Sequence, residues 1–287
     1  MKQLPRILLI TTALTLSACG QAGEQWMNPD KSFALFEQPD VHSVNETQEK
    51  MAKEAFAAED YARAVQYYEQ LIGAGKGTPE QQFGYKLAMA DSVRRLGDSA
   101  AALPMYDELY RLQPANVEVM EGRALAMMGS GKTEDAGRAF SEVMEKDQKR
   151  WRTLNALGIL FVTKNMVPEA MQYYTAALDL SPDNAAILNN VGLSYAVDRN
   201  FPRAITALEQ AARVSKTKPQ RKQIEMNLAM IHGVSGDMEA ARSVASKYYE
   251  GPALDNNLGL YAHLAKDNVL AKTYLNMALS QNPTFYE

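Results

Sequence analysis

Few residues in this chain have the types and spacing that catalysis needs. The three histidines, His42, His232 and His263, show no spacing typical of metal ligands. Neither the His-Glu-x-x-His motif of zinc peptidases nor the Gly-x-Ser-x-Gly motif of serine hydrolases occurs. The acidic residues are scattered, and there is one cysteine. The sequence therefore predicts no catalytic site, no metal and no cofactor, and an enzyme with an unrecognised site stays a distant alternative.

One segment has the form of a phosphate-binding loop. Residues 126–133, Ala-Met-Met-Gly-Ser-Gly-Lys-Thr, satisfy the permissive pattern, with alanine in place of the first glycine. A true loop of this kind follows a buried strand, whereas the residues before Ala126 have the pattern of a helix. Because Gly131 falls where related segments of this chain turn, a turn between two helices explains the glycines. We therefore predict no nucleotide binding.

The single cysteine, Cys19, follows an apolar segment at the start of the chain. Residues 7–16 form an apolar run behind a short basic start, and this run is shorter than the ~20 residues that span a bilayer. The tetrapeptide Leu16-Ser17-Ala18-Cys19 resembles a bacterial lipobox. That resemblance implies a signal peptide over residues 1–18 and a covalent lipid on Cys19 as the membrane anchor. An ordinary signal peptide cleaved near Ala18 is the alternative.

Residues 19–44 have the composition of a tether. They contain Pro29 and Pro39 and show no sustained helical period. Trp26, Phe33 and Phe36 are unusual in a plain linker. They either pack on the folded domain or form an epitope for a partner, and the residues do not decide between the two.

Composition and charge exclude several classes of protein. The chain has 287 residues, of which 46% are hydrophobic and 22% charged, which is ordinary for a globular protein. The formal net charge is −4, and no basic block occurs. A protein that binds nucleic acid through its phosphates carries a basic surface, so we predict no nucleic-acid partner.

A 34-residue period runs through the rest of the chain. In the unit that begins at Trp151, positions 4, 7, 8, 11, 20, 24, 27 and 32 hold Leu154, Leu157, Gly158, Phe161, Ala170, Tyr174, Ala177 and Pro182. This pattern resembles the tetratricopeptide repeat (TPR) at every signature position. Further units begin near residues 45, 83, 117, 185, 222 and 252, which makes seven within 45–285. The first and the last two are looser, with insertions near Gly75 and Pro219.

The repeat implies an all-α fold, a right-handed superhelical solenoid of about seven helix-turn-helix units. Small residues at positions 8, 20 and 27 let the two helices of a unit approach closely, and larger residues fill the space toward the next unit. One pair cannot bury its apolar stripe alone, so stacked pairs share a continuous core. Gly97 and Gly236 fall at position 15, between the two helices. No stretch shows the alternation typical of a strand.

Asparagines recur at two neighbouring positions of the repeat. Position 5 holds Asn155, Asn189 and Asn256, and position 6 holds Asn190, Asn227 and Asn257. In the repeat family the first helix lines the inner groove, notably at positions 2, 5, 9 and 12. This resemblance places the position-5 asparagines in one groove, with Leu193, Met230 and Leu260 at position 9. Amides can hydrogen bond an extended peptide backbone. The alternative is a structural link between adjacent units, which we favour for position 6.

Two segments give a more specific resemblance. Residues 227–237 and 256–261 resemble the tight-adherence (Flp/Tad) pilus assembly lipoproteins. The resemblance implies a periplasmic scaffold that binds protein partners such as a secretin subunit or other components of the apparatus. Gly20, rather than aspartate, follows Cys19, which by resemblance to sorted lipoproteins implies the outer membrane. A type IV pilotin, or another repeat lipoprotein of outer-membrane assembly, is the alternative.

Overall fold

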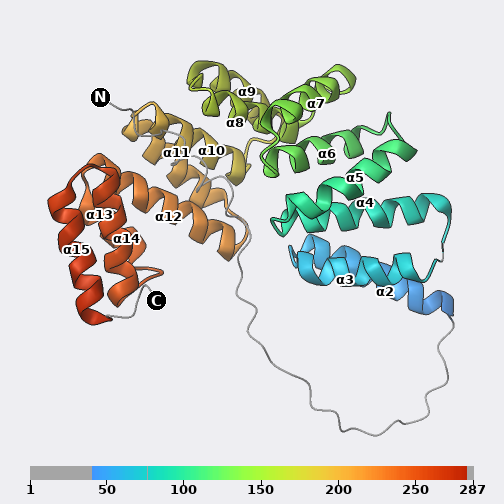
Figure 1. The fold of residues 1–287 in the computed structure, drawn as a ribbon, viewed down its shortest axis with the longest axis horizontal. Helices are drawn as coiled ribbons and strands as arrows, with labels where there is room; N and C mark the ends of the chain where they lie inside the picture. Colours follow the sequence, from blue (N-terminus) through green and yellow to red (C-terminus); the bar gives the residue numbers. More distant parts are fainter. Residues whose placement is uncertain (1–40, 76, 283–287) are drawn as a thin grey trace, which may run out of the picture. The chain divides into compact units, whose positions relative to one another are not determined.

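The structure, a computed structural model, describes residues 41–75 and 77–282 of the chain, and side chains from Thr47 onward. Within this part the chain forms fourteen α-helices and no strand (Figure 1). The predicted all-α class is therefore confirmed. The predicted signal peptide, Cys19, and Trp26, Phe33 and Phe36 of the predicted tether lie outside the described residues, as does the side chain of His42.

The helices form seven consecutive pairs. The first helices of the pairs are α2 (Val41–Ala57), α4 (Pro79–Arg95), α6 (Val117–Gly129), α8 (Trp151–Thr163), α10 (Ala185–Val197), α12 (Lys218–Ser235) and α14 (Gly251–Leu264). The second helices are α3 (Tyr61–Gly73), α5 (Ser99–Leu112), α7 (Thr133–Lys146), α9 (Val167–Leu180), α11 (Phe201–Val214), α13 (Met238–Ala245) and α15 (Asn268–Gln281).

The same turn joins the two helices of every pair. The residue at position 15 has a positive φ, between 58° and 98°, in all seven pairs: Glu59, Gly97, Gly131, Asn165, Arg199, Gly236 and Lys266. The next N–H donates to the carbonyl five residues earlier, as from Lys132 to Met127 at 2.9 Å, which ends the first helix. Gly131 thus belongs to a helix-to-helix turn, as predicted, whereas Gly129 is the last residue of α6.

Capping residues set where several first helices begin. Thr78 and Gln81 form a capping box ahead of Pro79, and Thr217 caps α12 with Pro219 in its first turn. As a result, α4 and α12 each begin four residues before the predicted starts at 83 and 222. Part of each apparent insertion is therefore an extra turn of helix. Likewise α2 begins at Val41, so its first turn includes residues 41–44 of the predicted tether.

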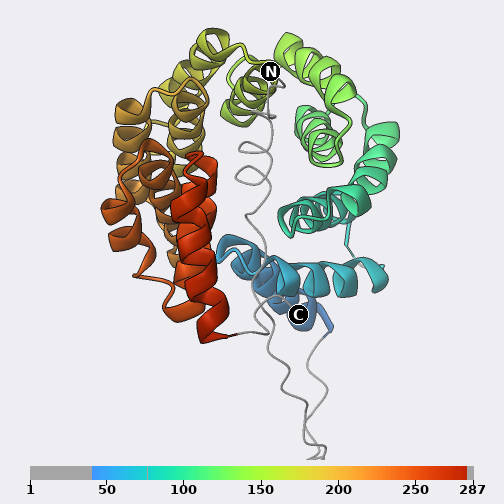
Figure 2. The ribbon, with the colours of Figure 1, turned by 60° about the vertical axis from the view of Figure 1, so that its left-hand side comes forward.

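The chain divides into two compact units, with the boundary between Gln148 and Lys149. In the described residues the N-terminal unit contains α2–α7 and the C-terminal unit contains α8–α15, and within each the pairs follow one another in chain order (Figures 1 and 2). The sequence predicted a single solenoid over 45–285 and had no signal for this division.

Small residues bring the helices of each pair together. The seven alanines at position 20 are all buried: Ala64, Ala102, Ala136, Ala170, Ala204, Ala241 and Ala271. At position 8, a Cβ added to Gly158 would lie 2.5 Å from the Tyr174 ring, and one added to Gly192 would lie 2.7 Å from Leu208 Cγ. Because no side chain larger than glycine fits at these two contacts, the small residues that recur with the 34-residue period let the first and second helices pack closely.

Candidate protein-binding surface

The predicted asparagines form a chain of hydrogen bonds across three first helices of the C-terminal unit. Asn227 on α12 donates to Asn189 Oδ1 on α10 (2.8 Å), and Asn190 on α10 donates to Asn155 Oδ1 on α8 (3.0 Å). Within α10, Asn189 donates to Asn190 Oδ1 at 3.4 Å, and Gln223 Nε2 lies 3.5 Å from Asn227 Oδ1. We call Asn155, Asn190, Asn189 and Asn227 the asparagine chain.

This chain gives its members a structural role as links between adjacent repeats. Asn190 and Asn227 are buried, whereas Asn155 and Asn189 are half-buried. Buried amides that lack partners cost free energy, so the cross-helix bonds help to fix the spacing of α8, α10 and α12. Each amide also has two N–H groups and two lone pairs, so Asn155 and Asn189 have the capacity to bond a ligand as well. Partner binding by these residues stays a prediction.

The other predicted groove residues differ in exposure. Asn256 is half-buried on α14, and Leu260 on the same helix is 48% exposed. Met230 is half-buried, but Leu193 is only 6% exposed. Leu193 and Met230 line the same small cavity at the contact of α10, α11 and α12. Because α12 covers it, Leu193 serves the core and offers a partner little surface.

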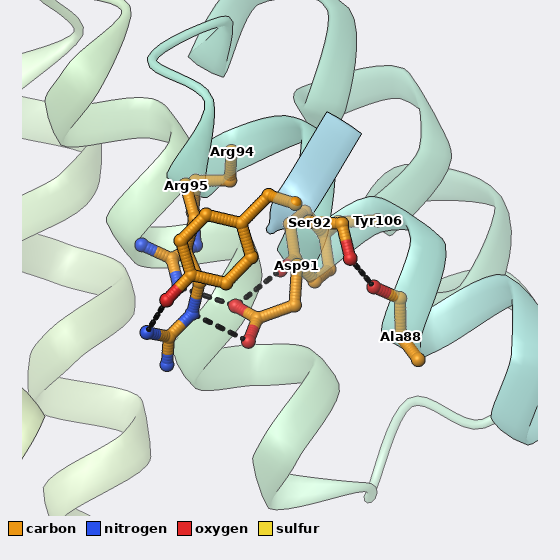
Figure 3. Close-up of polar contacts among 7 residues, drawn as sticks. Ala88, Asp91, Ser92, Arg94, Arg95 and Tyr106 are labelled. Carbon is orange, nitrogen blue, oxygen red and sulfur yellow. Dashed lines mark hydrogen bonds and ion pairs between the residues drawn. The ribbon is translucent and has the colours of Figure 1, made fainter. Parts of the chain in front are cut away.

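A second polar cluster, in the N-terminal unit, was not anticipated from the sequence. The Asp91 carboxylate accepts hydrogen bonds from Arg94, from Arg95 Nε at 3.0 Å and from the Tyr106 hydroxyl at 3.2 Å (Figure 3). The two arginines lie three and four residues after Asp91 on α4, which is the spacing of helical ion pairs. The spacing of Asp91, Arg94 and Arg95 could have indicated these ion pairs from the sequence. The hydrogen bond from Tyr106 could not be predicted in this way, because Tyr106 lies on another helix, α5.

Electrostatics in this cluster favour the charged aspartate. Burial by itself raises the pKa of Asp91, but the charges of Arg94 and Arg95 outweigh it and hold that pKa below its ordinary value. Arg95 also lies over the rings of Phe56 and Tyr61, 5.3 and 5.4 Å from their centroids. The cluster therefore ties α4 to α2, α3 and α5.

The described residues contain no group of three or more side chains suited to hold a metal ion. His232 is half-buried on α12 and His263 is exposed on α14, and the two belong to different pairs. No helix in residues 41–75 and 77–282 combines the length and apolarity needed to cross a membrane.

The helix pairs match a known repeat family. A model of the tetratricopeptide repeat matches residues 87–143, 123–185 and 190–257, more than half of the chain. The chain belongs to the tetratricopeptide-repeat family. Such repeats are scaffolds that bind other proteins, and the match indicates no catalytic family. The predicted repeat is thus confirmed.

Several known proteins are similar to this chain at low sequence identity. The BBSome complex member bbs-4 of Caenorhabditis elegans is 27% identical over 140 residues, 48% of this chain and 29% of that protein. The chain spans less than half the length of the curated relatives it matches.

PilW, a widely conserved type IV pilus biogenesis factor, is 20% identical, with 72% of this chain and 96% of that chain covered and a TM-score of 0.58. The human IFIT1 dimer with PPP-AAAA is 18% identical, with 81% and 59% covered and a TM-score of 0.63. At these identities the structural likeness shows the fold alone.

Proposed function

We propose that this TPR protein is an outer-membrane lipoprotein that faces the periplasm and binds protein partners during assembly of a pilus or secretion apparatus of the tight-adherence type. The asparagine chain is the observation that carries the binding part of the proposal, since it sets polar amides along three successive first helices. The lipobox-like Leu16–Cys19 supports the anchor, and the likeness to PilW supports a role in pilus biogenesis.

A type IV pilotin is the second candidate, because PilW is described as a type IV pilus factor and nearly all of its chain is covered. The two candidates differ in the secretin they bind. Purified protein titrated with a secretin fragment of each system separates them: preference for the tight-adherence fragment supports the proposal, and preference for the type IV fragment supports the alternative.

The proposed lipid anchor predicts that the protein leaves the membrane fraction when Cys19 is replaced. Replacement of Cys19 by alanine should move the protein from the membrane pellet to the soluble fraction, because it removes the atom that carries the acyl chains. Each buried CH₂ adds ~0.8 kcal/mol, so two or more chains hold stably. Ultracentrifugation of lysed cells and labelling with a fatty-acid analogue measure this. A wild-type protein that is soluble and unlabelled would refute the anchor.

We expect the position-5 asparagines to contribute to partner binding separately from their contribution to stability. Replacing Asn155, Asn189 and Asn256 together by alanine should weaken binding of the secretin fragment about a hundredfold, at ~0.5–1.5 kcal/mol for each lost hydrogen bond. The change also removes acceptors from Asn190 and Asn227, so it should lower the free energy of unfolding. Titrations well below the melting temperature measure the binding effect.

The matched control is the double variant Asn190→Ala, Asn227→Ala. It breaks the same two cross-helix bonds but keeps the position-5 amides. We expect it to lose stability as the triple variant does while it retains most of the affinity. An equal loss of affinity in both variants would assign the asparagines to structure alone.

A further inference from the structure

Positive charge gathers where α11 joins α12 in the C-terminal unit (Figure 1). Half of residues 213–222 are basic, and residues 210–224 contain no carboxylate. Uncharged residues separate most of these cations, so they form no continuous basic run in the sequence. We call the five the basic patch, which spans the end of α11, the turn and the start of α12: Arg213, Lys216, Lys218, Arg221 and Lys222.

None of these five cations forms an ion pair with a carboxylate of residues 41–75 or 77–282. Four of them are exposed, and Lys222 is half-buried. The Arg221 guanidinium donates to the Ser215 carbonyl at 3.2 Å, and Lys222 Nζ lies 4.8 Å from the centroid of the Tyr249 ring. Neither contact neutralises a charge, so the patch keeps all five.

The carboxylate that follows the patch on α12 has other partners. Glu225 comes four residues after Arg221, which is the spacing of a helical ion pair. It accepts hydrogen bonds instead from the Tyr248 hydroxyl at 2.6 Å and from Lys247 Nζ at 3.4 Å. The first turn of α12 begins with Lys218 and holds no acidic residue, although the helix dipole disfavours a cation there. Stability of the fold therefore does not explain the charges of the patch.

The two compact units carry net charges of opposite sign. Residues 41–148 contain 12 Lys and Arg and 18 Asp and Glu, which gives −6. Residues 149–282 contain 15 and 11, which gives +4. An anionic surface therefore attracts the C-terminal unit and repels the N-terminal unit, and the attraction is concentrated at the patch.

We propose that the basic patch docks on the anionic phospholipids of the membrane that holds the lipid of Cys19. This inference rests on the proposed function, because the anchor is what keeps the chain at a membrane. Arg213, Lys216 and Lys218 have no hydrogen-bond partners in the described residues that would fix their side chains in one geometry. Such a set suits a surface of many mobile phosphates better than a single fixed carboxylate.

Docking of the patch brings the asparagine chain close to the membrane. Lys218 and Asn227 both lie on α12, and at 1.5 Å per residue they are about 14 Å apart along the helix axis. A partner bound at the asparagine chain would then be held near the lipid surface. A subunit of an outer-membrane secretin meets that condition.

The test uses the full chain with Cys19→Ala, which removes the lipid and leaves the patch intact. Sedimentation measures binding to vesicles of phosphatidylcholine with phosphatidylglycerol and to vesicles of phosphatidylcholine alone. We expect at least tenfold tighter binding to the anionic vesicles, and this preference should disappear as salt is added, because salt screens exposed charges.

Removal of three exposed charges should abolish most of this binding. Each cation near an anionic lipid surface contributes about fivefold, so three contribute about a hundredfold. The variant replaces the three residues that make no ion pair or hydrogen bond through their side chains: Arg213→Gln, Lys216→Gln and Lys218→Gln. It should melt as its parent does.

A second triple variant controls for net charge. It removes the same three positive charges from exposed residues of the same unit outside the patch: Lys164→Gln, Lys266→Gln and Lys272→Gln. Binding to anionic vesicles should change by no more than about twofold. All of these proteins share the same N-terminal segment, so a difference between the two triple variants reports the patch.

A fluorescent label locates the contact. The chain has one cysteine, so Cys19→Ala provides a cysteine-free background for Gln210→Cys, an exposed site one turn before Arg213. A dye attached there should be quenched by vesicles whose phosphatidylglycerol is accompanied by lipids with a spin-labelled headgroup. An unquenched dye on bound protein would place the contact elsewhere and overturn the proposal.

Two other results would also overturn the proposal. An equal loss of binding in both triple variants would assign the attraction to net charge. Binding of polyglutamate, but not of anionic vesicles, through the patch would make an acidic protein its occupant. If either result is found while wild-type protein is fatty-acid labelled and sediments with membranes, the patch is rejected and the anchor at Cys19 stands.

Discussion

Replacement of Gly158 by leucine should lower the free energy of unfolding by about 3 kcal/mol or more, at the upper end of overpacking costs. Gly158 lies at position 8 of α8, and an added Cβ alone would come within 2.5 Å of Tyr174 Cε1 and 2.8 Å of its Cδ1. Tyr174 is 1% exposed on α9, and because protein interiors are close-packed, its ring has little room to move. Leucine must therefore push α8 and α9 apart.

A series at this position separates close packing from other effects. Gly158→Ala should already destabilise the protein, although alanine is the better helix former by about 1 kcal/mol. Lys164→Leu is the control, because Lys164 is exposed one residue beyond the end of α8. Urea titrations followed by circular dichroism give the midpoints. If Gly158→Leu and Lys164→Leu shift the midpoint equally, position 8 is not the contact between the two helices.

The repeat positions explain why the pairs could be predicted from the sequence. Gly158 on the first helix and Ala170 and Tyr174 on the second pack these two helices against each other. Because residues of these types recur with a fixed period, the sequence defines each helix pair. The turn was visible where position 15 is Gly97, Gly131 or Gly236, but the same left-handed conformation is adopted by Glu59, Asn165, Arg199 and Lys266. Asparagine adopts this conformation more readily than other residues that have a Cβ, whereas at Glu59, Arg199 and Lys266 the two packed helices impose a conformation that the residue itself does not favour.

The binding surfaces were less predictable because they depend on contacts between repeats. Position 9 was expected to face a groove, yet Leu193 is covered by α12 whereas Leu260 is exposed. The asparagines were placed on the correct helices, but the pairing of Asn190 with Asn155 depends on the distance between α8 and α10.

Replacement of Asp91 by alanine should destabilise the N-terminal unit by about 2 to 3 kcal/mol, because it leaves two arginines without their carboxylate. Loss of one partner of a fully buried pair costs ~3–5 kcal/mol. The expected effect is smaller because the Asp91 and Arg95 side chains are 25% and 26% exposed. Asp135→Ala is the matched control, since Asp135 and Arg138 have the same i, i+3 spacing on α7 but are 50% and 72% exposed. It should change stability by less than about 0.5 kcal/mol.

The pH dependence of this difference identifies its cause. The folded-state pKa of Asp91 lies below the ordinary value of 3.8, so the carboxylate stabilises the fold above that pH, and this stabilisation is lost as the pH falls through the folded-state pKa. The gap in unfolding free energy between wild type and Asp91→Ala should therefore be constant from about pH 5 to 8 and shrink below pH 4. A gap that persists unchanged at the lowest pH at which both proteins fold would mean that Asp91 stabilises the unit by packing, and that the two arginines do not need its charge.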